Sequence, residues 1–252
     1  MVLAWLAFYD ALLGVALAAA GIVAAHFGLT PPFEGFKIFL VGFFFAALAI
    51  ALGLLGMALT RGPERRSGQI RARAGVLLGL IVAAPVLAIM LRHPAIPIND
   101  IATDTQNPPQ FVAARKLPAN VGRNLAYNSK FAPIQQRRYP AIAPLVLDGS
   151  PDNVYQHVEI LAGEIPGWWI TRNDPKAREL EGVATSTVFR FKDDFIIQVR
   201  PDGAGKSLVE MRSKSRDGVS DLGTNYHRIM SFFRILKNGP RVPPPGGAQV
   251  QP

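Results

Sequence analysis

The chain of 252 residues contains no cysteine. Disulfide bonds, thiol catalysis and zinc sites built on thiolates are therefore excluded. Four histidines are present, and neither His157 nor His227 has a second histidine or an acid at metal-ligand spacing. A sequence without cysteine suits an oxidising compartment, in which stray thiols are a hazard. We expect no metal and no other cofactor.

Motifs of catalysis are also missing. No Gly-x-Ser-x-Gly turn surrounds Ser213 or Ser215, and the glycines form no phosphate-cradling loop. Asp193 and Asp194 are adjacent acids, but a predicted turn at that point favours aspartate by itself. The sequence therefore favours a binding or structural protein over an enzyme.

Acidic residues are outnumbered, since 27 Lys and Arg stand against 18 Asp and Glu. Part of the excess belongs to the C-terminal residues 94–252, which hold 20 basic and 15 acidic side chains. No nucleic-acid-binding module gathers this charge, so we expect no nucleic-acid partner. A mildly basic domain of this kind suits solubility beside an anionic lipid surface.

Long apolar runs, by contrast, fill residues 1–92. Three segments are long enough to span a hydrocarbon core, which needs about 20 apolar residues. They run over residues 5–27, 38–59 and 74–91. The first has neither a basic leading region nor a clear cleavage site, so we interpret it as a retained helix and not as a signal peptide.

The loop Thr60–Arg73 orients these three helices. It holds a single acid, Glu64, and five arginines: Arg61, Arg65, Arg66, Arg71 and Arg73. Short loops rich in Lys and Arg stay in the cytoplasm. We therefore expect a multi-pass protein of a bacterial inner membrane, with a cytoplasmic N-terminus and a periplasmic C-terminal domain.

Two features of the membrane part leave alternatives open. Gly75, Gly79 and Ala83 form a row of small residues that serves either packing within the bundle or a homodimer seam. Asp10 is an acid inside the first helix, which makes it a candidate functional residue. It also lies only about 8 Å from the start of that helix, within reach of the interface.

Residues 93–238 are predicted to form an extracytoplasmic α+β domain. Many prolines predict an irregular segment to about residue 144, whose apolar side chains suggest that it wraps over the domain. A helix over 150–165 and a last helix from Asp221 enclose about four strands. The predicted strands are 168–171, 180–191, 194–200 and 206–215. Short loops favour an antiparallel sheet with both helices on one face, and the Pro/Gly-rich tail 239–252 is predicted to be disordered.

Alternation along the strands divides this sheet into two faces. A hairpin loop at Lys192–Asp194 would gather one apolar face, which we place under the helices. Its members are Thr187, Phe189, Phe191, Phe195, Ile197, Val199, Val209 and Met211. The opposite face is basic and half apolar, and it is open to solvent, covered by residues 94–147 or occupied by an anionic amphipathic partner. The candidate ligand-binding residues there are Arg190, Arg200, Arg212, Lys214 and Arg216.

The arginines of the run Arg212–Arg216 suit two roles. They can grip a phosphate or carboxylate, or they can pair with nearby aspartates of the chain itself.

Three stretches of this domain resemble the bacterial and plastid family known as domain of unknown function 1499. The first is an Asp-x-x-Thr-Asp…Pro-Pro-x-Phe entry, matched by Asp100, Thr103, Asp104, Pro108, Pro109 and Phe111. The second is a Phe-x-Asp-Asp hairpin, matched by Phe191, Asp193 and Asp194. The third is a polar run matched by Arg212, Ser213, Ser215, Arg216, Asp221, Gly223, Asn225, Arg228 and Ile229. The resemblance covers roughly residues 98–237 and implies no reaction.

Two functions follow as hypotheses. The first is a non-catalytic binding module whose basic sheet face holds an anionic envelope ligand or a membrane lipid. The alternative is a structural or assembly partner of an inner-membrane complex, which uses the Gly75 and Gly79 row and the soluble domain as contact surfaces.

Overall fold

The computed structural model describes residues 2–59, 66–93 and 95–239. Arg61 and Arg65 of the arginine loop lie outside the described residues, as do residues 240–252 of the predicted tail. The chain divides into two compact units. One comprises Met1–Pro94 with the turn Ser186–Phe191, and the other comprises Ala95–Thr185 with Lys192–Pro252.

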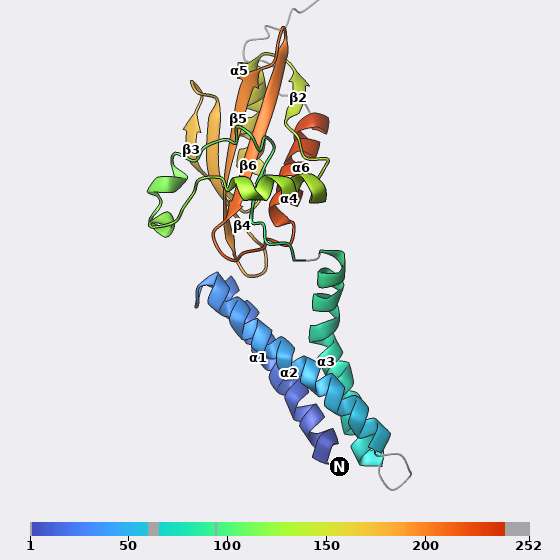
Figure 1. The fold of residues 1–252 in the computed structure, drawn as a ribbon. Coiled ribbons are helices and arrows are strands. Elements are labelled where there is room, and N and C mark those ends of the chain that lie inside the picture. The colour runs from blue at the N-terminus through green and yellow to red at the C-terminus, as the bar shows by residue number, and fades with distance from the viewer. Residues whose placement is uncertain (1, 60–65, 94, 240–252) are drawn as a thin grey trace, which may run out of the picture. The chain divides into compact units, whose positions relative to one another are not determined.

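Three long helices make up the first unit (Figure 1). They are α1 (Val2–His26), α2 (Pro32–Leu59) and α3 (Arg66–Arg92). All three are long and apolar enough to cross a membrane, as predicted. α3 begins at Arg66 and not at residue 74 as expected. Arg66, Arg71 and Arg73 therefore lie within its first turns. Arginine is a good helix former, and its long side chain can reach the interface from inside a helix.

Small residues bring α1 and α2 into direct backbone contact. The buried residues of α1 are spaced alternately three and four apart: Ala4, Ala7, Ala11, Gly14, Ala18, Gly21 and Ala25. Such a seven-residue repeat keeps one seam against a neighbouring helix. A Cβ added at Gly42 of α2 would lie 2.5 Å from the backbone nitrogen of Ala18. Only glycine therefore fits at position 42, and the small residues of the seam let the two backbones pack as closely as membrane helices prefer.

The Gly75 and Gly79 row of α3 also faces neighbouring helices. A Cβ at Gly75 would lie 2.7 Å from the carbonyl oxygen of Ala7 in α1. At Gly79 it would lie 2.7 Å from the carbonyl oxygen of Ala46 in α2. These two glycines therefore serve packing within the bundle, and a homodimer seam through them stays an untested prediction.

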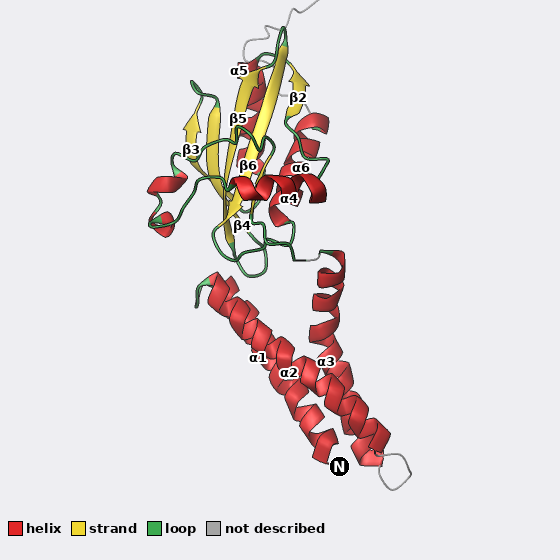
Figure 2. Cartoon of the chain, in the orientation of Figure 1, coloured by secondary structure: helices red, strands yellow, loops and turns green. Residues whose placement is uncertain are grey.

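A six-stranded antiparallel sheet forms the centre of the second unit (Figure 2). Its path is β1-β6-β5-β4-β3, and β2 also pairs with β6. The strands are β1 (Asp100–Ala102), β2 (Leu145–Asp148), β3 (Trp168–Asp174), β4 (Glu179–Thr185), β5 (Lys192–Pro201) and β6 (Lys206–Ser215). The sheet has two strands more than the four predicted. β1 belongs to the segment expected to be irregular, and β2 follows directly after that segment. They are short and pair only with β6, which no local pattern reveals.

The predicted helices are confirmed as α5 (Pro151–Glu164) and α6 (Thr224–Asn238). Ser150 caps α5 by accepting a hydrogen bond from the Asn153 nitrogen. The main core joins both helices to one sheet face, where Phe195, Ile197 and Met211 are fully buried. A shorter helix, α4 (Ala132–Arg138), follows three 3₁₀ turns.

The predicted hairpin loop at Lys192–Asp194 is wrong. Thr185 pairs with Lys192, and the turn between β4 and β5 consists of residues 186–191. Phe191 and Ser186 close this turn through a 2.8 Å backbone hydrogen bond. Thr187, Phe189, Phe191 and Arg190 therefore lie in the turn and not on a sheet face. The pleat of β5 still directs Phe195, Ile197 and Val199 to the helices, as expected.

Candidate functional site

The second face of the sheet is covered. Residues 103–131, here called the covering segment, cross it between β1 and α4. Phe111, Ala114 and Leu125 of this segment form a buried cluster with Ile196 of β5. Of the three fates considered for the basic face, a cover built from residues 94–147 is the one observed at this cluster.

Arg212 lies beneath this cover and is fully buried. Its guanidinium donates to both oxygens of Asp100, at 2.9 and 2.8 Å. It also donates to the backbone carbonyls of Pro109 and Leu125 in the covering segment. The Phe111 ring lies 4.8 Å from the guanidinium carbon. A buried charge persists only when it is paired and hydrogen-bonded, and Arg212 meets both conditions by tying the cover to the sheet.

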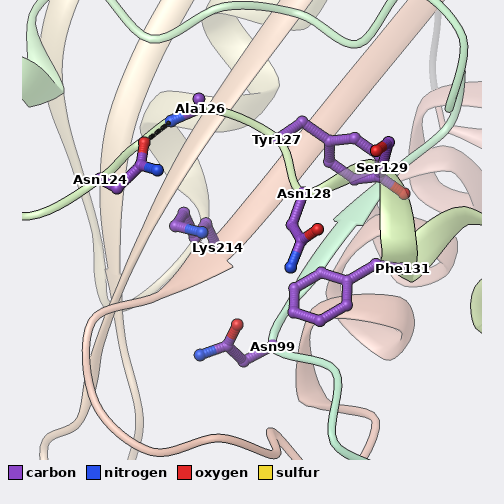
Figure 3. Close-up of a pocket in the computed structure, with 8 residues that line it drawn as sticks. All are labelled: Asn99, Asn124, Ala126, Tyr127, Asn128, Ser129, Phe131 and Lys214. Carbon is purple, nitrogen blue, oxygen red and sulfur yellow. Dashed lines mark hydrogen bonds between the residues drawn. The ribbon is translucent and has the colours of Figure 1, made fainter.

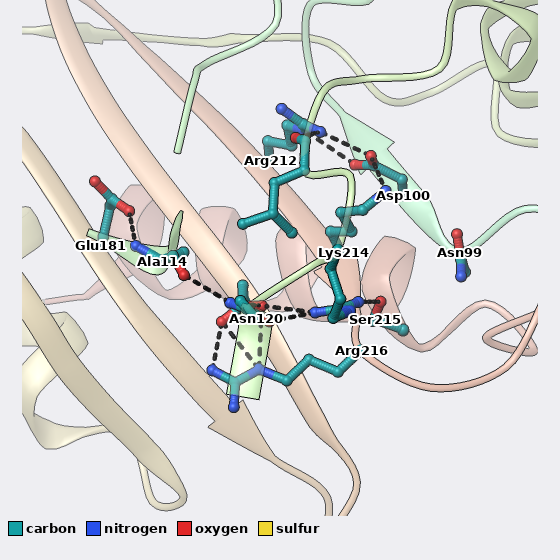
Figure 4. Close-up of polar contacts among 12 residues, drawn as sticks. Asn99, Asp100, Ala114, Asn120, Glu181, Arg212, Lys214, Ser215 and Arg216 are labelled. Carbon is teal, nitrogen blue, oxygen red and sulfur yellow. Dashed lines mark hydrogen bonds and ion pairs between the residues drawn. The ribbon is translucent and has the colours of Figure 1, made fainter. Parts of the chain in front are cut away.

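Two buried carboxylates of this face are each shared by two cations. Asp100 is shared by Arg212 and Lys214, whose ammonium donates to it at 2.9 Å (Figure 4). Asp194 is shared by Arg216, at 2.6 Å, and by Arg123, at 3.5 Å. Four cations thus share two carboxylates, and two positive charges remain without a carboxylate of their own. The excess favours an anion at whichever cation solvent can reach.

Polar side chains fasten the covering segment at its centre. The Glu181 carboxylate accepts hydrogen bonds from three successive backbone nitrogens, Val112 to Ala114, at 2.9–3.0 Å. Buried Asn120 donates to Asp194 at 3.0 Å and to the Ala114 carbonyl at 2.8 Å. Figure 4 shows this amide between the cover and the sheet. The segment is therefore a fixed part of the domain.

The remaining predicted site residues do not converge with Lys214. Arg200 forms an ion pair with the buried Glu210. Arg216 is held by Asp194. Arg190 adopts a left-handed backbone, with φ of 62°, in the turn before β5. Its placement on the basic face followed from the wrong hairpin loop.

Polar side chains of β5 and β6 that point to the other face of the sheet contact α6. Ser213 and Ser215 contact Asn225, at 2.7 and 2.9 Å. Arg228 donates to Asp193 at 2.5 Å. Together with Asp100 and Arg212, these are residues of the family motifs, and their bonds hold α6 and the cover to the sheet. The motif residues named here thus account for the fold, and no reacting group emerges among them.

A hollow of about 490 Å³ opens beside Lys214 (Figure 3). Its lining is rich in amides: Asn99, Asn124, Ala126, Tyr127, Asn128, Ser129, Phe131 and Lys214. The Lys214 side chain is 11% exposed, and an ammonium carries three donors. Its one hydrogen bond to Asp100 therefore leaves donors for a ligand. Lys214 is the one predicted site residue that lines this hollow.

Tyr127 forms part of the same wall. Burial, together with the nearby Asp100 carboxylate, raises the pKa of Tyr127 to about 12, so the phenol stays neutral at physiological pH. Across residues 2–59, 66–93 and 95–239, no three His, Asp or Glu side chains are grouped closely enough to hold a metal ion. The hollow therefore offers hydrogen-bond donors and one cation.

The sequence did not predict the three asparagines that line this hollow. Asn99 precedes a three-residue strand, and Asn124 and Asn128 belong to the covering segment, where no periodicity exists to be detected. The one feature that could have indicated them is the frequency of asparagine in an irregular stretch. Asparagine is equally favoured there by turns, so its frequency does not indicate a binding site.

Fold and site together define an α+β domain with a covered, charged sheet face, preceded by three helices that are long and apolar enough to cross a membrane. The family model described as protein of unknown function (DUF1499) matches residues 100–236. The chain belongs to this family, as the resemblance suggested. No curated protein and no solved structure matches the chain.

Proposed function

We propose that this protein is a non-catalytic binding module, anchored in a bacterial inner membrane, whose periplasmic domain holds an anionic envelope ligand at Lys214. The observation that carries the proposal is the shared Asp100 carboxylate. Because one Asp100 carboxylate serves both Arg212 and Lys214, the three side chains together keep a net charge of +1, and Lys214 is the cation of the two that solvent reaches. The hollow is the side from which an anion reaches it.

The amides around Lys214 support a polar anion. Asn99 donates one of its two amide N–H groups to the Gly218 carbonyl at 2.6 Å, which leaves the other N–H as a donor. Asn124 and Asn128 each accept from a nearby backbone nitrogen, at 2.9 and 3.1 Å, so their NH₂ groups remain as donors. Ammonium and amide donors together suit a phosphate or a carboxylate. The source is either a lipid headgroup or a free anion.

The arginines of Thr60–Arg73 support the location. They favour a cytoplasmic loop, so the domain after α3 would lie in the periplasm and its ligand in the envelope.

Native mass spectrometry of the full chain in a non-ionic detergent tests the proposal. The protein is measured as purified and again after addition of inorganic phosphate, and the mass of each adduct separates a lipid from a free anion. The variants are Lys214→Gln and Lys206→Gln, the control, whose lysine is exposed at the start of β6.

We expect adducts on the wild type and on Lys206→Gln, and an at least tenfold weaker adduct on Lys214→Gln. A tenfold loss corresponds to about 1.4 kcal/mol. Lys214→Arg retains the charge and should retain part of the adduct, which separates a binding defect from misfolding. A wild type without any anionic adduct, or equal adducts on all variants, would refute the proposal.

A further inference from the structure

A second hollow adjoins the first. It has a volume of about 430 Å³ and is lined by residues 115 and 120–126. Asn124 and Ala126 line both hollows, so these two residues form a common wall. The backbone nitrogen of Ala126 donates to the Asn124 side chain at 2.9 Å, which gives that wall a fixed shape.

Each hollow contains its own cation. Lys214 lines the first and two arginines, Arg115 and Arg123, line the second. Arg123 is committed to the fold, because it donates to the Ser215 carbonyl at 2.8 Å and contacts Asp194. Arg115 is exposed, and no hydrogen bond or ion pair occupies its guanidinium within the described part of the chain. A second exposed cation therefore lines the hollow on the other side of Asn124 and Ala126 from Lys214.

The charge balance matches this arrangement. Asp100 and Asp194 are the carboxylates that pair with the cations of this edge, and each serves two cations. The two charges left over are distributed between the Lys214 side and the Arg123 side, and Arg115 adds a third. A single anionic group placed in one hollow would neutralise only part of this charge.

We infer that the two hollows form one bipartite site for a ligand with two linked anionic groups, of the diphosphate class. One group binds at Lys214 and the amides, and the other binds at Arg115, with the nearby Arg123 adding its positive charge to the second hollow. The inference rests on the proposed function, because it names the ligand class of the same Lys214 site. Arginine suits the second position, since its planar guanidinium donates two parallel hydrogen bonds to a phosphate.

The experiment compares three probes on the full chain in detergent: inorganic phosphate, pyrophosphate and tripolyphosphate. Titration calorimetry measures each affinity for the wild type, Lys214→Gln and Arg115→Gln. Lys116→Gln is the matched control, because Lys116 is an exposed neighbour of Arg115 that lines neither hollow.

We expect at least tenfold tighter binding of pyrophosphate or tripolyphosphate than of phosphate. Arg115→Gln should abolish this gain and leave phosphate affinity unchanged, whereas Lys214→Gln should weaken all three probes. Lys116→Gln should behave as the wild type.

The two proposals fail in different ways. Phosphate that binds through Lys214, with no gain for the longer probes and no effect of Arg115→Gln, overturns the bipartite site alone. No saturable binding of any probe overturns both.

Discussion

At the scale of single residues, Asp100 is the most consequential side chain of the domain. It is fully buried and is the only carboxylate within hydrogen-bond distance of Arg212 and Lys214 among the described residues. Replacing one partner of a buried ion pair leaves an uncompensated charge in the interior, which costs about 3–5 kcal/mol. Its position at the start of β1 also ties the covering segment to β6.

We therefore predict that Asp100→Asn lowers the free energy of unfolding by about 3–5 kcal/mol. Urea titration of the full chain in detergent, followed by tryptophan fluorescence, measures the effect, since Trp168 packs against the core with its ring 4.1 Å from that of Phe195. Asp202→Asn is the control, because Asp202 is exposed in the turn before β6. Equal midpoints for the two variants would show that the Asp100 pair adds no stability.

At the scale of elements, the seam between α1 and α2 depends on the absence of side chains. Gly14, Gly21, Gly35 and Gly42 all lie where a Cβ would come within 2.9 Å of the opposite backbone. Lipid tails are as apolar as leucine, so close packing and not the hydrophobic effect holds two such helices together. Many large apolar side chains of α1 and α2 are accordingly exposed on the outside of the bundle.

Gly42→Leu should force α1 and α2 apart and destabilise the bundle by about 1–3 kcal/mol, the usual cost of overpacking. Val41→Leu is the matched control, because Val41 directly precedes Gly42 and is 47% exposed. Titration with sodium dodecyl sulfate, followed by circular dichroism, compares the two. If both variants unfolded at the same sodium dodecyl sulfate content as the wild type, close packing at this seam would not contribute to the stability of the bundle.

At the scale of the whole molecule, orientation decides which ligands the domain can meet. The absence of cysteine gives a direct test, because every introduced cysteine is unique. Ala204→Cys places a thiol in the exposed turn between β5 and β6. Ser67→Cys places one directly after Arg66 in the sequence. Right-side-out spheroplasts are treated with a membrane-impermeant maleimide.

We predict rapid labelling of Ala204→Cys in intact spheroplasts and labelling of Ser67→Cys only after lysis, because short loops rich in arginine are retained in the cytoplasm. The unmodified chain should remain unlabelled throughout. The reverse pattern would place the domain in the cytoplasm and remove envelope anions from the candidate ligands.

Part of this architecture is determined by the sequence alone, because its signals are local. Hydropathy predicted the three long helices, apolar spacing predicted α5 and α6, and strand alternation assigned Phe195 and Met211 to the helix side. Each signal needs only neighbours within a few residues. The family match likewise follows from residues that can be read along the chain.

Only the tertiary structure decided the fate of the charged face. Asp100 meets Arg212 across 112 positions of sequence, and the covering segment has no periodicity that would reveal where it lies. The sequence identified the basic residues of this face but not their partners. Ion pairs across a sheet depend on strand register and on loops that are distant in the sequence. Folding therefore converts a face predicted to be broadly basic into a mostly paired interior, with Lys214 left at the edge of one hollow.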